Sequence, residues 1–334
     1  MARKLASIQK VKALSAIEGA DAIETATVLG WQVVTKKNEF NVGDLCVYCE
    51  IDSHLPEKPE FEFLRPRKFV IKTVRLRGQI SQGICFPLSI LPSDTPLEEG
   101  LDVTEVLEIT KYEPPLSAGL GGQTKGYFPG FMPKTDETRV QVLEDVLEQH
   151  RNKIFYVSEK VDGASMTCYL KEGEFGVCSR SLELVESTDS LYWVCARKLN
   201  LENKLKSLSG DFAFQGELAG EKIQSNRLKL KGLHFFVFNI FNIKEYRYLN
   251  YQEFRDTANQ LGLETVPIVE ENFLLTTEIT VNYLVNYSIN KSLLNTQAWR
   301  EGIVLRPLIE AKDNYLGRLS FKAINPEYLL KHGE

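Results

Sequence analysis

Short runs of alternating apolar and polar residues, separated by turn residues, make up the first 112 positions of the chain. Four of these runs have the pattern of β-strands: "GWQVVTKK", "DLCVYCEID", "FVIKTVRLRG" and "QGICFPLSIL". The segment "NEFNVG" and the residues Gly78 and Gly83 interrupt them, as turn residues do. Because helical periodicity is nearly absent here, the pattern predicts a small β-barrel over residues 1–112, and the OB type fits this size.

Residues 113–134 separate this region from the rest of the chain. They contain four prolines and five glycines and lack periodic apolar residues, which predicts a linker or loop. Residues 135–334 contain seven further strand-like runs: "KIFYVSEK", "ASMTCYL", "EFGVCSRSLEL", "DFAFQGELAG", "LHFFVFNIF", "EGIVLRPL" and "GRLSFKAI". Two helical stretches lie near 251–262 and 277–289. The predicted fold class is α+β, with an N-terminal OB-like β-barrel domain and a C-terminal domain of antiparallel sheets with flanking helices.

A helix is also predicted directly after the linker, where either Thr135 or Asp136 could serve as its N-cap. The apolar residues at helical spacing are Val140, Leu143, Val146 and Leu147. Lys134 and Arg139 would lie at the N-terminal end of this helix, where the helix dipole favours an anion. A plain capped helix without a ligand fits the same residues.

The composition is that of an ordinary soluble globular protein, with 43% hydrophobic and 25% charged residues among 334. No apolar run approaches the ~20 residues that span a bilayer, and "MARKLASIQKVKAL" has no secretory signal. We therefore expect a cytoplasmic or otherwise intracellular protein that is not secreted, has no membrane partner and is a monomer. The lone C-x-x-C of Cys46 and Cys49 lies in a strand-like run, which favours core thiols over a redox or metal site.

One segment is strongly basic although the net charge of the chain is −5. The run "RPRKFVIKTVRLRG" contains no acidic residue and six basic ones: Arg65, Arg67, Lys68, Lys72, Arg75 and Arg77. A solvated face would normally mix both signs of charge. The cluster predicts binding to a phosphate backbone, with an ordinary solvated strand as the alternative.

The run "SEKVDGASMTCYL" carries the first candidate for chemistry. Lys160 and Asp162 are two residues apart, so in an extended segment their side chains share one face, and Gly163 would permit a sharp turn after them. A carboxylate beside an amine can hold a metal ion close to whatever the amine attacks. Without further residues, K-x-D-G is too short to be specific, and a surface lysine at a turn explains it equally well.

Further charged and aromatic residues lie in or at the ends of later apolar runs. In chain order they are Arg180, Glu217, Phe238, Glu301 and Lys322. Charges in such positions are costly unless they pair with one another or bind a ligand. Buried ion pairs that hold two sheets together are the alternative to a binding site.

In this order the motifs resemble those of the covalent nucleotidyltransferases, which comprise the polynucleotide ligases and the mRNA capping enzymes. The series is K-x-D-G, S-R, G-E-x-x-G, an aromatic strand, E-G-h-V (h being apolar) and a final lysine strand. The runs "PGFMPKTDETRVQ" and "GELAGEKIQSN" are similar to RNA ligases in particular. The strand-rich N-terminal region and the chain end 12 residues after Lys322 resemble the fifth RNA ligase family, the Naegleria and Deinococcus type. The resemblance covers nearly the whole chain.

The resemblance implies an ATP-dependent RNA ligase of RNA repair that joins 3′-OH and 5′-phosphate ends or nicks. Lys160 would attack the α-phosphorus of ATP and form a lysyl–AMP intermediate. A nearby cation and Lys322 would depress the pKa of this lysine and so free its amine. The implied metal is Mg²⁺ or Mn²⁺, held largely through its waters by Asp162, Glu217 and Glu301.

The remaining implied contacts concern the nucleotide and the RNA. Arg180 and Glu217 would bind the ribose, Phe238 would stack on adenine, and Val161 would join the same ATP site. Lys322 would neutralise the α-phosphate. Lys134 and Arg139 are candidates for the leaving pyrophosphate or the RNA 5′-phosphate.

Two positions depart from the family pattern. Many relatives have K-x-K in the last motif, where Ser320 stands here, so one α-phosphate contact is missing or comes from elsewhere. The aromatic strand often reads F-D-I, and because an amide lacks the charge of aspartate, Asn239 is left out of the metal shell.

Rival functions remain open from the sequence. Capping guanylyltransferases and DNA ligases normally have a further OB domain after the last motif, for which 12 residues leave no room. A non-catalytic RNA-binding protein would give Lys160, Glu217, Glu301 and Lys322 no reason to occur together.

Overall fold

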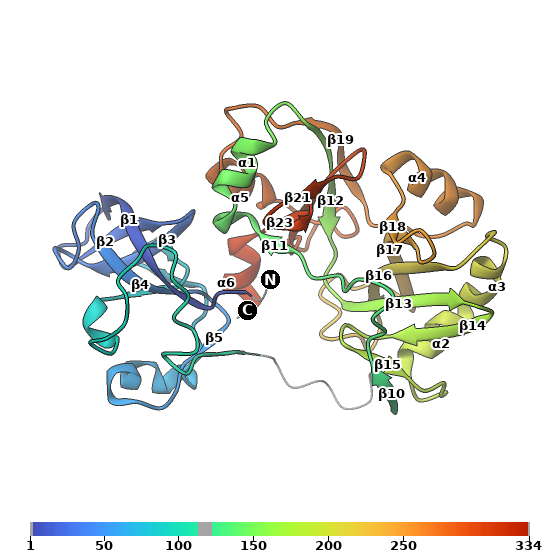
Figure 1. Cartoon of the computed structure of the whole chain (residues 1–334), viewed down its shortest axis with the longest axis horizontal. Coiled ribbons are helices and arrows are strands. Elements are labelled where there is room, and N and C mark those ends of the chain that lie inside the picture. Colours follow the sequence, from blue (N-terminus) through green and yellow to red (C-terminus); the bar gives the residue numbers. More distant parts are fainter. Residues whose placement is uncertain (1–2, 113–121, 333–334) are drawn as a thin grey trace.

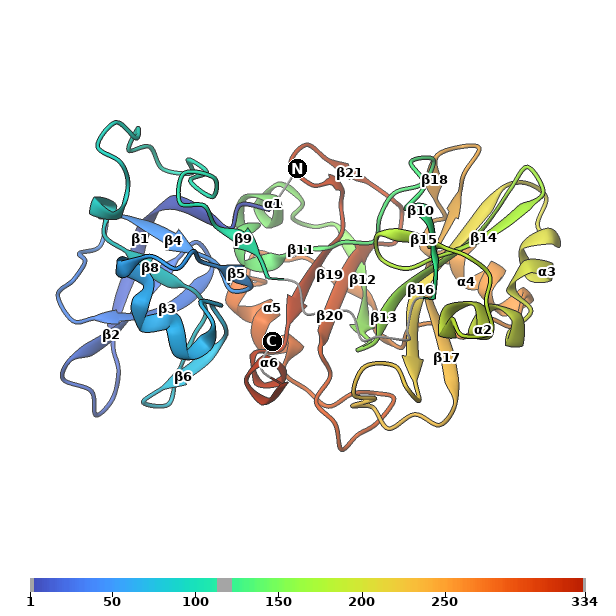
Figure 2. The same cartoon turned by 90° about the horizontal axis from the view of Figure 1, so that it is seen from below.

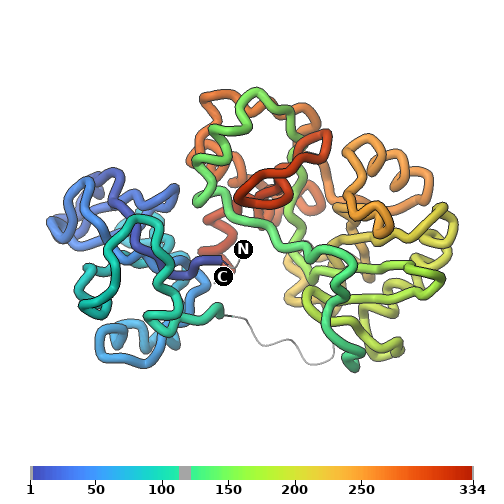
Figure 3. Tube along the Cα trace, viewed as in Figure 1, coloured from blue at the N-terminus to red at the C-terminus, as the bar shows by residue number. Residues whose placement is uncertain are grey.

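The computed structural model describes residues 3–112 and 122–332. Figure 1 shows a barrel of the first strands at one end of the molecule and two sheets with helices in the remainder. The tube in Figure 3 shows that the C-terminal residues return to the middle, beside the barrel. Within the two described ranges, no helix is long and apolar enough to cross a membrane.

The barrel is a five-stranded antiparallel sheet in the order β3-β2-β1-β4-β8. Its strands are β1 (Ala6–Ala16), β2 (Ile23–Val28), β3 (Trp31–Lys36), β4 (Leu45–Cys49) and β8 (Ile84–Phe86). Burial alternates along β3, because every second side chain points into the barrel, beginning with Trp31. The Gln82 N–H donates to the Gln32 carbonyl at 2.8 Å and ties the segment before β8 to β3. The predicted barrel is thus observed.

The basic run 65–78 is not the single strand that its pattern indicated. Its first residues end the 3₁₀ helix η1 (Pro59–Arg67), and its last ones form β6 (Val74–Leu76), which pairs with β7 (Gln79–Ser81). The turn between them needs positive φ at Lys68 and Phe69, which interrupts an otherwise strand-like apolar pattern. Two short elements complete this part: η2 (Leu88–Ile90) and the pair β5 (Ser53–His54) with β9 (Thr110–Lys111).

The predicted linker was wrong for its second half. Residues 113–121 lie outside the described residues, but β10 (Thr124–Tyr127) is a strand that pairs with β15 (Leu182–Leu184). The Phe128 N–H then donates to the Ser181 carbonyl at 2.9 Å, and the Phe128 and Met132 side chains are buried. Edge pairing and two anchoring side chains hold this glycine-rich segment, and neither depends on apolar periodicity.

A seven-stranded antiparallel sheet follows in the order β10-β15-β14-β13-β16-β17-β18. Its other strands are β13 (Ala164–Lys171), β14 (Glu174–Cys178), β16 (Phe212–Gly220), β17 (Leu233–Asn242) and β18 (Arg247–Tyr248). One face packs in a common core with the helices α2 (Leu191–Lys198), α3 (Leu201–Lys206) and α4 (Tyr251–Gln260). All six cysteines of the chain are free and buried, including Cys46 and Cys49 in β4.

The second sheet of this region has the order β11-β23-β20-β12-β19. Its strands are β11 (Thr138–Arg139), β12 (Ile154–Lys160), β19 (Ile268–Leu274), β20 (Gly302–Pro307) and β23 (Phe321–Ile324). The hairpin β21 (Lys312–Asp313) and β22 (Gly317–Arg318) precedes β23. Helix α5 (Val281–Ser288) packs against this sheet, and helix α6 (Pro326–His332) follows it.

The helix predicted directly after the linker begins later than expected. Parallel pairing with β23 holds Thr138 and Arg139 in the extended strand β11, so no helix can begin at Thr135 or Asp136. The helically spaced apolar residues are instead divided between η3 (Val140–Val142) and α1 (Glu144–Gln149). Arg139 therefore belongs to a sheet, and the helix-dipole argument for an anion there fails.

Helix α6 belongs to the core of the barrel although it ends the chain. Tyr328 and Leu329 are buried in the same cluster as Ile8, Trp31 and other barrel residues. Figures 1 and 2 both place α6 between the barrel and the five-stranded sheet that contains β23. The barrel and the rest of the chain therefore share an apolar core, to which α6 contributes residues shortly after Lys322.

We predict that Leu329→Ala lowers the free energy of unfolding by about 2–4 kcal/mol, since it leaves a cavity in this shared core. Urea denaturation followed by tryptophan fluorescence would measure it. The exposed Leu97→Ala is the matched control and should change stability by less than about 0.5 kcal/mol. Equal effects of the two variants would contradict the shared core.

Candidate active site

Lys160 ends strand β12 and contacts Glu301 directly. Its Nζ lies 2.7 Å from Oε1 and donates a hydrogen bond of 2.8 Å to Oε2 of the same carboxylate. The register explains the pairing, because Lys160 lies opposite Gly302 of β20 and Glu301 immediately precedes that strand. Both side chains are mostly buried. The lysine is therefore not an ordinary surface residue.

Glu217 and Asp162 complete the surroundings of this amine. Glu217 lies in β16 opposite Ser165 of β13, and its charge and that of Asp162 both act on the pKa of Lys160. The chain bends at Gly163, as expected, but Gly163 is not among the glycines with a positive φ, so the bend alone does not require glycine. A Cβ at Gly163 would lie 2.4 Å from the Leu218 carbonyl oxygen and 2.9 Å from Cγ of Glu217. Glycine is needed because the two strands approach closely beside the acid.

The pKa values of the two lysines move in opposite directions. Burial disfavours the charged Lys160, but the carboxylates of Glu301, Glu217 and Asp162 outweigh it and raise its pKa. Burial, followed by Arg139 and Lys160, lowers the pKa of Lys322 to about 7. The expected depression of the Lys160 pKa is thus absent among the side chains alone. Lys160 is held as an ammonium ion, and Lys322 is the lysine that is half neutral near pH 7.

The pKa of Glu217 is strongly raised. Burial raises its pKa to about 8, with Glu301 and Asp162 adding to the rise against the opposing effect of Lys160. The acids carry more negative charge than the adjacent lysine balances. In the described part of the chain, no three Asp, Glu, His or Cys side chains form a group that could hold a metal ion directly.

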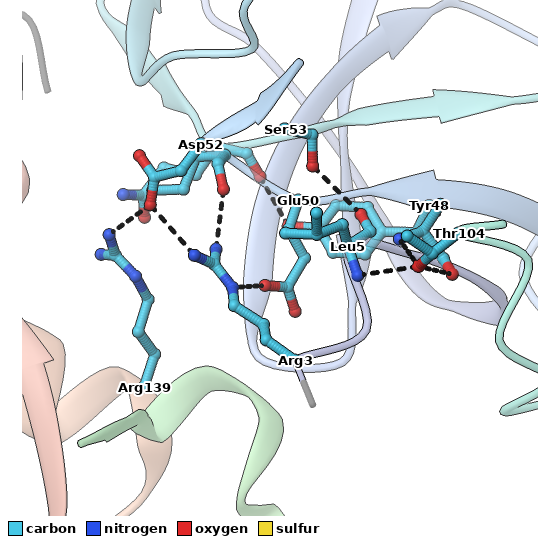
Figure 4. Close-up of polar contacts among 11 residues, drawn as sticks. Arg3, Leu5, Tyr48, Glu50, Asp52, Ser53, Thr104 and Arg139 are labelled. Atoms are coloured by element: carbon cyan, nitrogen blue, oxygen red, sulfur yellow. Dashed lines mark hydrogen bonds and ion pairs between the residues drawn. The ribbon is translucent and has the colours of Figure 1, made fainter. Parts of the chain in front are cut away.

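Arg139 lies beside Lys322 in the register of β11 and β23 and reaches the barrel. One of its nitrogens contacts the Asp52 carboxylate at 3.0 Å, and the same carboxylate accepts from Arg3 at 3.1 Å (Figure 4). Its other terminal nitrogen, Nη1, is buried and has no hydrogen-bond partner among the described residues. Asp52 follows β4 and carried no sequence signal of its own, since its partner is 87 residues away.

The residues predicted to contact the nucleotide come from several strands and the segments between them. Phe238 packs in an apolar cluster with Val161, and the Arg306 guanidinium lies 5.5 Å from the Phe238 ring centroid. Arg180, between β14 and β15, pairs with Asp136 and also acts on the charge of Glu217. Arg306 was missed, although a lone arginine in the apolar run "EGIVLRPL" is a usable signal. It is buried, bonds Glu137 at 2.9 Å, and leaves Nε and Nη1 without a partner among the described residues.

The two departures from the family pattern have local explanations. Asn239 is buried between Gln215, to which its amide donates at 3.3 Å, and Arg318, from which its oxygen accepts at 3.1 Å. Arg318 already has Glu310 as its counter-ion, so a second acid is not required there. Ser320 and Lys134 line a cavity of about 230 Å³, and the buried Ser320 hydroxyl has no partner among the described residues.

The raised pKa of Glu217 predicts how stability depends on pH. The folded protein binds a proton that the unfolded chain has lost between the ordinary pKa of 4.5 and about 8, so stability falls across this range. Glu217→Gln has no carboxyl group at this position, so its stability does not fall for this reason. In metal-free buffer, its free energy of unfolding should therefore rise relative to wild type from pH 5 to pH 8 and then level off.

Lys322→Met is the matched variant, because Lys322 makes the free energy of unfolding change with pH in the opposite direction from Glu217. Unfolding binds a proton between about 7 and 10.5, so the wild type gains stability as pH rises through this window. The advantage of Lys322→Met over wild type should shrink accordingly. Urea denaturation at a series of pH values measures both variants, and pH-independent differences would show that the two groups keep ordinary pKa values.

Comparisons with known proteins agree with this geometry. An OB-fold domain family matches residues 5–88, which confirms the predicted barrel type, and the RNA ligase family matches residues 153–324. No curated protein gives a significant match.

Solved structures of the Naegleria gruberi RNA ligase cover nearly the whole chain. The enzyme with pyrophosphate is 39% identical, with 99% of both chains covered and a TM-score of 0.91. Two mutants of that enzyme, one with ATP and manganese and one with AMP and manganese, are 38% identical with the same coverage and TM-score. On these grounds the chain belongs to the RNA ligase family.

Proposed function

We propose that the protein is an ATP-dependent RNA ligase that seals 3′-OH and 5′-phosphate ends through lysyl–AMP on Lys160. The observation that carries the proposal is the buried Lys160 amine, which meets Glu301 at 2.7 Å and acts within the field of Glu217 and Asp162. The structures of the Naegleria enzyme with ATP, AMP and pyrophosphate support it. In the first step, Lys160 Nζ forms a bond to the α-phosphorus of ATP as the bond to pyrophosphate breaks.

The acids fit a divalent cation bound through water. Burial raises the pKa of Glu217 to about 8, the charges of Glu301 and Asp162 add to the rise, and a cation would compensate those charges. The absence of a ready cage of three acids in the described part of the chain suits Mg²⁺ or Mn²⁺ that keeps its waters. When bound, such a cation supplies positive charge that lowers the pKa of Lys160 and neutralises phosphate oxygens. The chain itself holds Lys160 in place through Glu301.

Lys322 and Arg139 provide the remaining positive charge for the phosphates. They are neighbours in register, and the unpartnered Nη1 of Arg139 has a donor to offer an anion. Arg139 is a permanent cation, whereas Lys322 gains its proton fully only in the presence of an anion. We assign to Arg139 the α-phosphate contact that Ser320 cannot make. We assign the RNA 5′-phosphate to Lys134, which lines the cavity described above.

The base and ribose would lie between the two sheets. Phe238 offers its ring to adenine, with Val161 beside it in the same apolar cluster and Arg306 behind the ring. Arg180 and Glu217 would bind the ribose, which requires Arg180 to leave Asp136. AMP then passes to the 5′-phosphate of the RNA, and attack by the 3′-OH releases AMP and forms the phosphodiester bond.

We predict that Lys160→Met abolishes labelling of the protein by α-labelled ATP and Mg²⁺, because no other side chain replaces the amine. Lys206→Met, which removes an exposed lysine, is the control and should label like the wild type. Labelling of Lys160→Met at the wild-type rate would refute the proposal. Labelling by GTP in place of ATP would instead indicate a capping guanylyltransferase.

The N-terminal barrel is proposed to hold nicked or broken RNA, with part of the basic run as the contact. Arg65 is paired with Glu57 and Glu62, Arg75 with Glu327, and Lys72 lies over the Tyr112 ring. Arg67, Lys68 and Arg77 are exposed, and their side chains have no partner among the described residues. These three are the residues best placed to meet phosphates. The intracellular location and the monomeric state stay predictions.

We predict that Arg67→Glu/Arg77→Glu weakens sealing of a nicked RNA duplex by roughly tenfold or more at physiological salt, through lost and reversed phosphate contacts. Self-adenylylation should be unchanged, because neither residue belongs to the ATP site. Lys36→Glu/Lys37→Glu is the control with the same charge change on exposed residues of the barrel. Equal loss of sealing and adenylylation in the first variant would contradict the assignment. Substrates with RNA or DNA on each side of the nick would define the specificity.

A further inference from the structure

Arg227 connects the K-x-D-G motif to the last helix of the chain. It lies in the segment between β16 and β17, and its Nη1 contacts Asp162 Oδ1 at 3.2 Å. The same nitrogen donates to the Tyr328 hydroxyl at 2.6 Å, and the guanidinium lies 5.5 Å from the Tyr328 ring centroid. Arg227 and Asp162 are both largely buried. Three segments far apart in the sequence thus meet at one cation.

Tyr328 gives this contact its structural importance. Its ring is 1% exposed and is packed in the barrel core, while its hydroxyl faces Arg227. The preceding residue of α6, Glu327, pairs with Arg75 of the basic run on the barrel. One helix therefore contacts both the barrel surface proposed to meet RNA and the arginine that holds Asp162.

Asp162 requires such a partner because of where it lies. It comes after the end of β12, so no strand pairing fixes its backbone, and its carboxylate acts on Lys160 among two further acids. A bond from Arg227 to Oδ1 restricts the rotation of the carboxylate. Buried arginine–carboxylate pairs orient both groups because the guanidinium is planar and permanently charged.

We infer that Arg227 is a positioning residue for lysine adenylylation: it fixes the Asp162 carboxylate beside Lys160 and does so only while α6 is docked in the barrel. The inference rests on the proposed function and extends it. The barrel is then required for the first step through Tyr328, in the absence of RNA, and not only for holding the RNA strand. Arg227 itself makes no contact with the reacting atoms.

The test measures the rate at which the full chain is labelled by α-labelled ATP and Mg²⁺ without RNA. Arg227→Gln should lower the rate at saturating ATP by about tenfold, because a misplaced carboxylate costs rate, while the KM for ATP changes by less than about threefold. The labelling rate of Arg227→Lys should lie between those of the wild type and Arg227→Gln. Lysine keeps the positive charge but lacks the planar guanidinium that contacts Asp162 and Tyr328 together. Asp162→Asn/Arg227→Gln should be no slower than Asp162→Asn, because Arg227 acts through Asp162.

Two matched variants separate positioning from general damage. Tyr328→Phe keeps the ring in the barrel core and removes only the hydroxyl, so it should slow labelling by roughly two- to fivefold. Tyr287→Phe removes a hydroxyl that bonds Glu270 elsewhere, and Arg255→Gln removes an arginine that bonds Thr265. Both controls should label at the wild-type rate.

Thermal unfolding in EDTA supplies a readout that does not depend on activity. Arg227→Gln removes a cation that contacts a buried carboxylate, so it should lower the Tm more than Asp162→Asn/Arg227→Gln does. If Arg227→Gln fails to fold, the labelling rates of Arg227→Lys and Tyr328→Phe test the positioning role of Arg227 instead.

Three results would overturn the inference. They are wild-type labelling by Arg227→Gln or by both Arg227→Lys and Tyr328→Phe, independent effects of the Asp162 and Arg227 substitutions, and equal slowing by Tyr287→Phe. Failure of the wild type to become labelled would instead refute the proposed function, so the two failures are distinguishable.

Discussion

The contact on which the rest of the structure depends is a buried ammonium group held by carboxylates from separate segments. Lys160 ends one strand, Glu301 precedes its neighbour, and Glu217 comes from the opposite sheet. Separated, each charge would be too costly to bury; together they offset most of that cost. Burial, with Glu301 and Asp162 adding to it, raises the pKa of Glu217, and a cation bound beside these acids would favour the charged form of all three.

Register explains why this arrangement needs both sheets and the strand β11. Pairing of β12 with β20 brings Lys160 beside Glu301, and pairing of β23 with β11 brings Lys322 beside Arg139. The second pair reaches the barrel through Asp52, and α6 reaches it through an apolar core. The barrel thus contacts the rest of the chain through an ion pair beside Lys322 and through an apolar core. A rearrangement of the barrel would therefore change the surroundings of Arg139, the residue that we propose binds phosphate.

The sequence predicted the strands better than the segments that join them. Strands such as β12, β16 and β20 contain apolar runs with one or two charged residues, a pattern that requires no knowledge of partners. β10 and β11 were missed because their order comes from pairing with distant strands, and α6 because its apolar residues pack on the barrel. The motif residues were found through the resemblance. Arg227 and Asp52 were not found, because their partners Asp162 and Arg139 lie 65 and 87 residues away in the sequence.

The serine at position 320 follows from the same charge balance. Lys322 already lies beside Arg139 and Lys160, and these cations together with burial lower its pKa to about 7. A lysine at 320, immediately before the same strand, would add another cation to a region that also contains Arg318. It would either lose its proton or lower the pKa of Lys322 further. We propose that Arg139 on the neighbouring strand acts as the second cation in place of a lysine at 320, because a guanidinium group is a permanent cation in proteins.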